Sequence, residues 1–68
     1  MNISEIFSLA VQNQKKNNYQ VAKDLYNQTI KINPNLVEAY NNLGFIFNLE
    51  GQNEKAKECY EKAIKIKH

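Results

Sequence analysis

Apolar residues recur along this chain at the three- and four-residue spacing of amphipathic helices. Ile3, Ile6 and Ala10 share one face of a predicted first helix, with Leu9 beside them, and similar faces recur in three later segments. The later faces are Ala22, Tyr26, Thr29 and Ile30; Tyr40, Leu43, Gly44 and Phe47; and Ala56, Tyr60, Ala63 and Ile64. The pattern predicts four helices, over about residues 3–16, 19–32, 36–50 and 53–67, and therefore an all-α fold.

Short polar motifs predict where these helices begin and end. Asn2 with Glu5, and Asn35 with Glu38, read as capping boxes, in which an N-cap side chain and an acid three residues later satisfy each other's backbone amides. Asn17 and Gly51 follow the first and third helices, and both residue types tolerate the left-handed conformation that ends a helix. Pro34 pushes the residue before it out of the helical region and so stops the second helix.

The four helices form two copies of one unit. When the sequence is shifted by 34 residues against itself, seven positions are identical, and they fall mainly on the apolar helical faces. Small residues stand at 10, 22, 44 and 56, which predicts a close approach of the two helices in each hairpin, with Gly44 against Ala56. The identical pairs are Leu9 and Leu43, Ala22 and Ala56, Lys23 and Lys57, Tyr26 and Tyr60, and the runs Ile30–Ile32 and Ile64–Ile66.

These positions resemble the tetratricopeptide repeat, a 34-residue helical hairpin with a bulky residue, Leu-Gly, Tyr, Ala, an aromatic residue, Ala and Pro. The first repeat departs from that pattern at Asn13 and Thr29, and His68 stands where the second repeat would carry its Pro. The matching residues are Ile6, Leu9, Ala10, Tyr19, Ala22, Tyr26 and Pro34 in the first repeat, and Tyr40, Leu43, Gly44, Phe47, Ala56, Tyr60 and Ala63 in the second.

The resemblance implies one domain over residues 1–68, with repeats at about 3–36 and 37–68, stacked as a short right-handed α-solenoid. It also implies a concave groove, formed by the first and third helices, that binds a peptide or helix of a partner protein. The groove positions carried over are Ser4, Phe7, Val11, Gln14 and Lys15, and Glu38, Asn41, Phe45, Asn48 and Leu49.

Phe7, Val11, Phe45 and Leu49 lie off the main packing faces, where four large apolar side chains are hard to explain as solvent-facing residues. The residues alone leave open whether they form this groove or a wide core stripe between the hairpins.

Composition and charge limit the other function classes. The net charge of +2 comes from nine Lys, with no Arg, set against seven carboxylates, so no basic nucleic-acid stripe is present. Because the 34-residue period and Pro34 also differ from the related 35-residue RNA-binding repeats, we expect no nucleic-acid partner. One Cys and one His form neither a disulfide nor a zinc site, so we expect no metal or cofactor. The sequence contains no arrangement of catalytic groups, so we expect no catalytic residues and no enzyme. Lacking a signal peptide or membrane span, the chain is expected to be cytoplasmic without a membrane partner.

The main alternative to partner binding is a structural, self-associating repeat unit. Repeat units usually need about three copies, and one core of this size supplies only about 3–5 kcal/mol without staples. Tyr60, Ile64 and Ile66 on the last helix are therefore candidates for contacts within a homo-oligomer. The sequence does not distinguish a complete protein from an excised pair of repeats or an idealised one.

Overall fold

Four helices make up the whole of the regular structure over residues 1–67, the part of the chain that the computed structural model describes. They are α1 (Ile3–Lys15), α2 (Tyr19–Ile32), α3 (Val37–Leu49) and α4 (Asn53–Lys67). The predicted boundaries agree within a residue or so, and the all-α prediction is confirmed. His68, predicted to take the place of the second repeat's Pro, lies outside the described residues.

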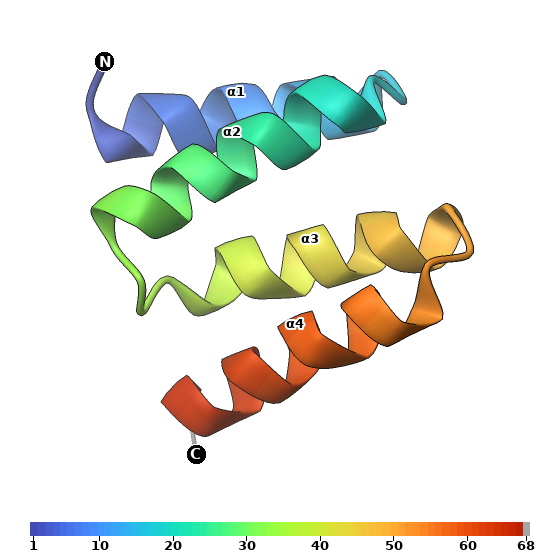
Figure 1. The fold of residues 1–68 in the computed structure, drawn as a ribbon. Coiled ribbons are helices and arrows are strands. Elements are labelled where there is room, and N and C mark those ends of the chain that lie inside the picture. The colour runs from blue at the N-terminus through green and yellow to red at the C-terminus, as the bar shows by residue number, and fades with distance from the viewer. Residues whose placement is uncertain (68) are drawn as a thin grey trace.

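The helices form two antiparallel hairpins that lie one above the other (Figure 1). α1 packs on α2, α3 packs on α4, and α2 contacts α3 to join the hairpins. α1 and α3 therefore run in the same direction (Figure 1). This arrangement is the predicted stack of helical hairpins.

The first predicted capping box is present at the start of α1. The Asn2 side-chain oxygen accepts a hydrogen bond from the Glu5 backbone N–H at 2.9 Å, and the Glu5 carboxylate accepts one from the Asn2 backbone N–H at 3.0 Å. Two backbone donors at the helix start are thereby satisfied, and the acid also lies at the positive end of the helix dipole.

The second predicted capping box, at Asn35 and Glu38, is wrong. The N-cap of α3 is Leu36, and no side chain caps this helix. Asn35 is instead part of the turn around Pro34. Its backbone N–H donates to the Asn33 side-chain oxygen at 3.0 Å, and the Leu36 N–H donates to the Asn33 carbonyl at 3.2 Å. The turn therefore engages the backbone of the residue that the sequence suggested as a cap.

α1 and α3 end in the same way, 34 residues apart. Asn17 and Gly51 have φ angles of 65° and 75°, in the left-handed region. The next residue closes the helix end in both hairpins, because the Asn18 N–H reaches back to the Asn13 carbonyl and the Gln52 N–H to the Phe47 carbonyl, both at 2.8 Å. This is the Schellman arrangement, and it confirms the predicted stops.

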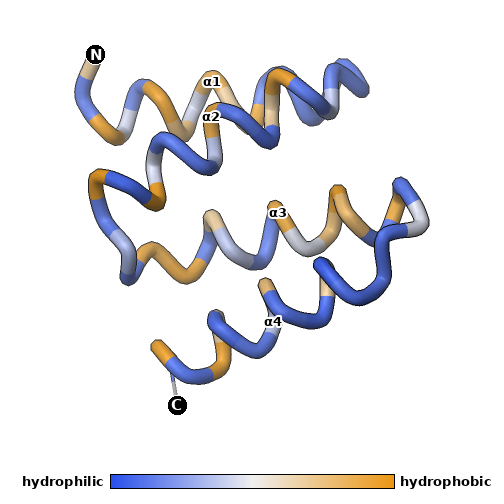
Figure 2. The backbone as a smooth tube through the Cα atoms, viewed as in Figure 1, coloured by the Kyte–Doolittle hydropathy of each residue, from blue (hydrophilic) through white to orange (hydrophobic). Residues whose placement is uncertain are grey.

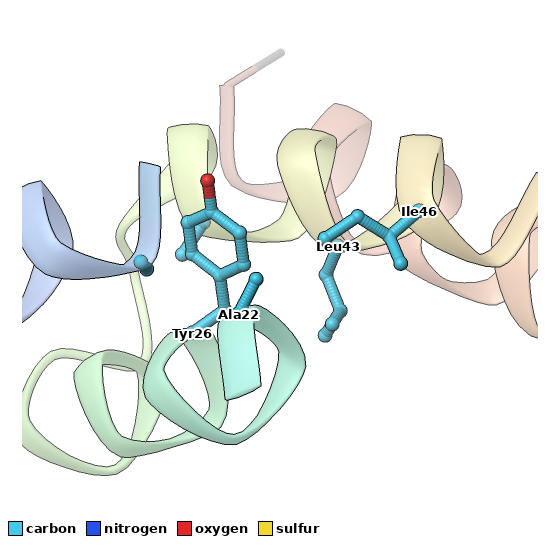
Figure 3. Packing of buried hydrophobic residues seen from close by; sticks show 6 residues of the cluster. Ala22, Tyr26, Leu43 and Ile46 are labelled. Carbon is cyan, nitrogen blue, oxygen red and sulfur yellow. The ribbon is translucent and has the colours of Figure 1, made fainter. Parts of the chain in front are cut away.

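The core lies mainly where α2 meets α3. Ala22 and Tyr26 of α2 face Leu43 and Ile46 of α3 (Figure 3), and Ala10 of α1 joins the same cluster. Among the cluster residues, only Leu43 is more than 0% exposed. The two hairpins therefore share one core.

Two residues of this core do not belong to the apolar faces predicted from the sequence. Ala39 and Ile46 are both 0% exposed, whereas the residues 34 positions earlier, Glu5 and Gln12, are exposed on α1. The repeat alignment could not reveal this difference, because α3 is covered by helices on two sides and α1 is an outer helix. Burial follows the place of each helix in the stack.

Gly44 marks the close crossing of α3 and α4, as predicted, but its partner differs. A Cβ atom at Gly44 would lie 3.0 Å from Cε1 of Tyr60 and 3.2 Å from Cβ of Cys59. The nearest neighbours of Gly44 are therefore Tyr60 and Cys59, about one helical turn beyond Ala56, the residue predicted to face it. Position 44 has no room for a side chain, and the Tyr60 ring takes up the space beside it.

Polar residues dominate the outer surface, above all on α4, which is coloured mainly as hydrophilic in Figure 2. One ion pair links the hairpins: Lys23 Nζ lies 2.7 Å from the Glu50 carboxylate. The same ammonium group lies 5.3 Å from the centre of the Phe47 ring. Lys23 of α2 therefore holds the C-terminal end of α3 by charge and by a cation–π contact.

Candidate partner-binding groove

Two hollows lie along the side of the molecule where α1 and α3 run in the same direction. The first has a volume of about 250 Å³ and the second about 540 Å³. Both are lined by residues of α1 and α3, the two helices expected to form a groove. Of the ten predicted groove residues, eight line these hollows: Ser4, Phe7 and Glu38 the first, and Val11, Gln14, Lys15, Phe45 and Leu49 the second.

The first hollow lies at the N-terminal ends of α1 and α3. Its lining also includes Ile3, Asn33 and Leu36, because the connection between the hairpins passes along it. Among residues 1–67, Glu38 in the first turn of α3 is the only charged residue that lines it. This hollow is small and mostly apolar.

The second hollow, which we call the central hollow, combines apolar walls with several amide side chains. Val11, Phe45 and Leu49 supply the apolar surface, and Gln14 and Asn42 supply amides. Lys15, Asn17 and Tyr19 complete its lining. An apolar depression with a few placed polar groups is the usual character of a ligand-binding surface.

A buried tyrosine links the two amides of the central hollow. Tyr26 belongs to α2 and is 0% exposed. Its hydroxyl donates a hydrogen bond to the Gln14 side-chain oxygen at 2.5 Å and accepts one from the Asn42 side-chain nitrogen at 3.1 Å. In Figure 3 the hydroxyl points away from α2, beyond the apolar cluster. Side chains from three helices therefore meet at one oxygen atom.

The surroundings of Tyr26 change its acidity. Burial raises the pKa of the phenol above its ordinary value of 10.0, and the hydrogen bond from Asn42 opposes that rise. The hydroxyl consequently stays protonated near neutral pH, as its hydrogen bond to Gln14 requires. The Phe7 ring packs beside the Tyr26 ring, with the two ring centres 5.7 Å apart and the ring planes at 63°.

The four large apolar residues expected in the groove divide into two pairs. Phe7 and Val11 of α1 are half-buried and pack against the core cluster, while they also line the hollows. Phe45 and Leu49 of α3 are 50% and 52% exposed. The core interpretation therefore describes α1 better, and the groove interpretation describes α3 better.

Asn41 and Asn48, the remaining predicted groove residues, are exposed and line neither hollow, whereas Asn42 lines the central one. The two helices face each other across the groove, so equivalent positions on them do not turn to it equally. The sequence did contain a signal for Asn42. Glu38, Asn42, Phe45 and Leu49 follow one another at spacings of four, three and four residues, so they lie on one face of α3. The groove positions taken from the family resemblance included Asn41 in place of Asn42.

The residues expected to mediate self-association lie on or near the outer side of α4. Tyr60 and Ile66 are half-buried, and the Tyr60 ring is used in part against Gly44. Ile64 is 67% exposed, whereas the equivalent Ile30 in α2 is half-buried against the core cluster. Ile64 is thus the main apolar side chain left uncovered on this helix.

The remaining chemistry of residues 1–67 is sparse. No group of three or more His, Cys, Asp or Glu side chains there is placed to hold a metal ion. Burial, and secondarily the Glu58 carboxylate, raise the pKa of the Cys59 thiol, which disfavours a reactive thiolate. None of the four described helices is long and apolar enough to cross a bilayer. The groove can act through hydrogen bonds and apolar contacts.

Comparison with known proteins agrees with the repeat architecture. Residues 37–68 match the family model of the tetratricopeptide repeat, over the segment that contains α3 and α4. No curated protein gave a significant match. The first hairpin has the same two helices, the same left-handed stop after its first helix and the same 34-residue spacing. The second hairpin is therefore identified as a tetratricopeptide repeat, and the first hairpin has the same architecture.

Proposed function

We propose that this protein binds a peptide or helix of a partner protein in the groove between α1 and α3. Tetratricopeptide repeats are in general protein-interaction modules, and this one has a candidate surface. The observation that carries the proposal is the central hollow, where half-exposed Phe45 and Leu49 lie beside the amides of Gln14 and Asn42.

The energetics favour a partner at this position. Fully burying a large apolar side chain contributes about 1.5–3 kcal/mol, and Phe45 and Leu49 have about half of that burial still to gain. The adjoining amides can satisfy polar groups of a bound segment, so covering the hollow need not leave unpaired donors or acceptors. Apolar area together with placed hydrogen-bonding groups gives both affinity and specificity.

A random-peptide display selection tests this proposal directly. The protein is immobilised, peptides are selected on it, and their affinities are measured for the wild type and for Phe45→Ser. Val21→Ser is the matched control, because Val21 is 48% exposed, lies on α2, and lines neither hollow. We expect Phe45→Ser to weaken binding about tenfold or more and Val21→Ser to leave it nearly unchanged.

Two results would contradict the groove as the binding surface. One is a selection that yields no peptide with measurable affinity. The other is a set of peptides whose affinity falls equally for both variants, since equal losses would place the contact elsewhere or reflect altered stability. Thermal unfolding of each variant separates the last two explanations.

Self-association through α4 is a second candidate, and one observation favours it. Ile64 is 67% exposed, whereas its equivalent, Ile30, is half-buried against the core cluster. A second copy packed on α4 would bury Ile64 together with the free edges of Tyr60 and Ile66. Because two of these side chains are already half-buried, the patch is small and the association is expected to be weak.

Sedimentation equilibrium at tens of micromolar measures this association. Ile64→Lys should shift the distribution to the monomer, and Ile32→Lys is the control, because Ile32 is 57% exposed on α2. A wild-type protein that is strictly monomeric across the concentration range would rule out the second candidate. It would leave peptide binding in the groove unaffected.

A further inference from the structure

Another hollow, which we call the rear hollow, lies on the side of α3 away from the groove. It has a volume of about 250 Å³ and is lined from three helices: Asn27 and Ile30 of α2, Tyr40 and Leu43 of α3, and Glu58, Cys59 and Lys62 of α4. Residues of a helix are about 100° apart around its axis, so Tyr40 and Leu43 point almost opposite to Phe45 and Leu49 of the central hollow. The rear hollow is therefore separate from the groove.

The lining of the rear hollow is apolar where it is buried and polar where it is exposed. Leu43 is 5% exposed and Tyr40 8%, and Ile30 is half-buried against the core cluster. The exposed lining residues are Asn27, Glu58 and Lys62. An apolar interior with a few polar groups around it is the usual character of a small-ligand site.

The Tyr40 hydroxyl is the unusual group of this site. The hydroxyls of Tyr19 and Tyr26 donate to Asn17 and Gln14, whereas Tyr40 forms no hydrogen bond within residues 1–67. Every side-chain oxygen or nitrogen sealed from solvent in that part of the chain has a partner, so solvent still reaches the Tyr40 oxygen. A molecule that fills the hollow displaces this solvent, and it binds well only if it offers the hydroxyl a hydrogen bond in return.

The size of the rear hollow limits what can fill it. Pockets that enclose drug-sized ligands have volumes of about 300–1,000 Å³, so this smaller hollow accommodates a single ring. Aromatic rings pack favourably on the ring of another aromatic residue and beside polarisable sulfur, and Tyr40 and Cys59 supply these two partners. The lining therefore favours an aromatic ring over an aliphatic group of the same size.

We propose that the rear hollow binds a phenol group, whose ring packs on Ile30 and Leu43 and whose hydroxyl pairs with that of Tyr40. A hydroxyl both donates and accepts, so two phenols form a hydrogen bond in either direction. The tyrosine side chain of a partner protein and a small free phenol share this chemistry. The site is additional to the groove and does not depend on peptide binding there.

Two probes that differ only in the hydroxyl test the site. p-Cresol is the tyrosine side chain as a free molecule, and toluene is the same ring without the hydroxyl. Each is titrated into protein with ¹³C-labelled methyl groups, and we expect the methyl signals of Ile30 and Leu43 to shift. p-Cresol should bind about five-fold more tightly than toluene, the gain expected for one net hydrogen bond. A hollow that acts through apolar contact alone would favour toluene, the more hydrophobic probe.

Variants of two tyrosines assign the preference to one hydroxyl. Tyr40→Phe retains the ring and removes a hydroxyl without a partner, so the protein should fold and the preference for p-cresol should disappear. Tyr19→Phe is the matched control, because the half-buried Tyr19 lines the central hollow, and it should leave the preference unchanged. Should Tyr40→Phe fail to fold, as judged by circular dichroism, Ile30→Ala removes part of the apolar wall and should weaken both probes about three-fold.

A third probe distinguishes the two sources of the phenol. N-acetyl-tyrosinamide carries the same ring with peptide groups on both sides of its Cα atom. Shifts of the same methyl signals by this probe would assign the site to a tyrosine of a partner protein. Binding of p-cresol alone would assign it to a free phenol, because the added peptide groups are then too large for the site.

Four outcomes would overturn the inference. Toluene that binds as tightly as p-cresol, or more tightly, would exclude recognition of the hydroxyl. A preference for p-cresol that persists in Tyr40→Phe would show that Tyr40 is not its source. Shifts confined to Val11 and Leu49 would place both probes in the central hollow. Affinities unchanged in Ile30→Ala would exclude the rear hollow as the binding site.

Discussion

Substitution of Gly44 probes the tightest contact between α3 and α4. Relative to Gly, Ala at an exposed helical position would stabilise the protein by about 1 kcal/mol, because it reduces the freedom of the unfolded chain. Here the new Cβ would meet Cε1 and Cζ of Tyr60 at 3.0 and 3.1 Å and Cβ of Cys59 at 3.2 Å. Carbon atoms prefer separations of about 3.5–4.0 Å, so all three contacts are too short.

The two neighbours respond differently to the added methyl group. Tyr60 is half-buried and its ring can shift by a few tenths of an ångström. The Cβ of Cys59 is bonded directly to the backbone of α4, so relief at that contact requires the helix itself to move. Overpacking of this kind typically costs about 1–3 kcal/mol. After the gain in propensity, we expect Gly44→Ala to lower the free energy of unfolding by about 1 kcal/mol, and Gly44→Leu by about 2–3 kcal/mol.

Urea unfolding followed by circular dichroism measures both variants, and the midpoint reports the change if the slope is constant. Asn41→Ala is the control, since Asn41 is exposed on the same helix and the substitution tests propensity without packing. A Gly44→Ala variant that is stabilised as much as Asn41→Ala would show that α3 and α4 do not approach closely here. Replacing Tyr60 by Leu should recover part of the loss, and a double-mutant cycle gives that coupling.

Three further predictions follow from particular side chains. Phe45→Ser and Val21→Ser should each lower the free energy of unfolding by about 1 kcal/mol or less in thermal melts, because both side chains are about half exposed; a loss of several kcal/mol at Phe45 would make it a core residue. Asn2→Ala should cost about 1 kcal/mol by urea unfolding, because the capping box is lost, and an unchanged midpoint would contradict that role. Burial raises the pKa of folded Tyr26 above 10.0, so its contribution to stability is complete below pH 10.0 and falls as the pH rises further. Urea midpoints on either side of that pH should therefore fall more for the wild type than for Tyr26→Phe, and parallel curves would contradict this.

Much of the candidate groove could be located from the sequence, because a repeat of known period places equivalent residues on equivalent helices. Phe45 and Leu49 were identified as apolar side chains off the packing face, and both are about half exposed at the central hollow. Asn42 was missed, although it lies on the same helical stripe. Its role depends on the Tyr26 hydroxyl, which comes from a different helix, and no local pattern reports a hydrogen bond between residues 16 positions apart.

Local rules were sufficient for the helices and their ends. The apolar spacing, the left-handed stops at Asn17 and Gly51, and the break at Pro34 depend on only a few neighbouring residues each, so the sequence alone determined the four helices and the 34-residue repeat. The failed cap at Asn35 shows the limit, since a turn that used the same backbone displaced it.

Only the tertiary structure decided how the hairpins share their residues. It placed Gly44 against Tyr60, and it buried Ile46 while leaving the equivalent Gln12 exposed. It also brought the side chains of Gln14 and Asn42 to the hydroxyl of Tyr26. These outcomes depend on which helix covers which, and on small shifts of register between helices. Periodicity along one chain fixes the face of each helix but not the face that it meets.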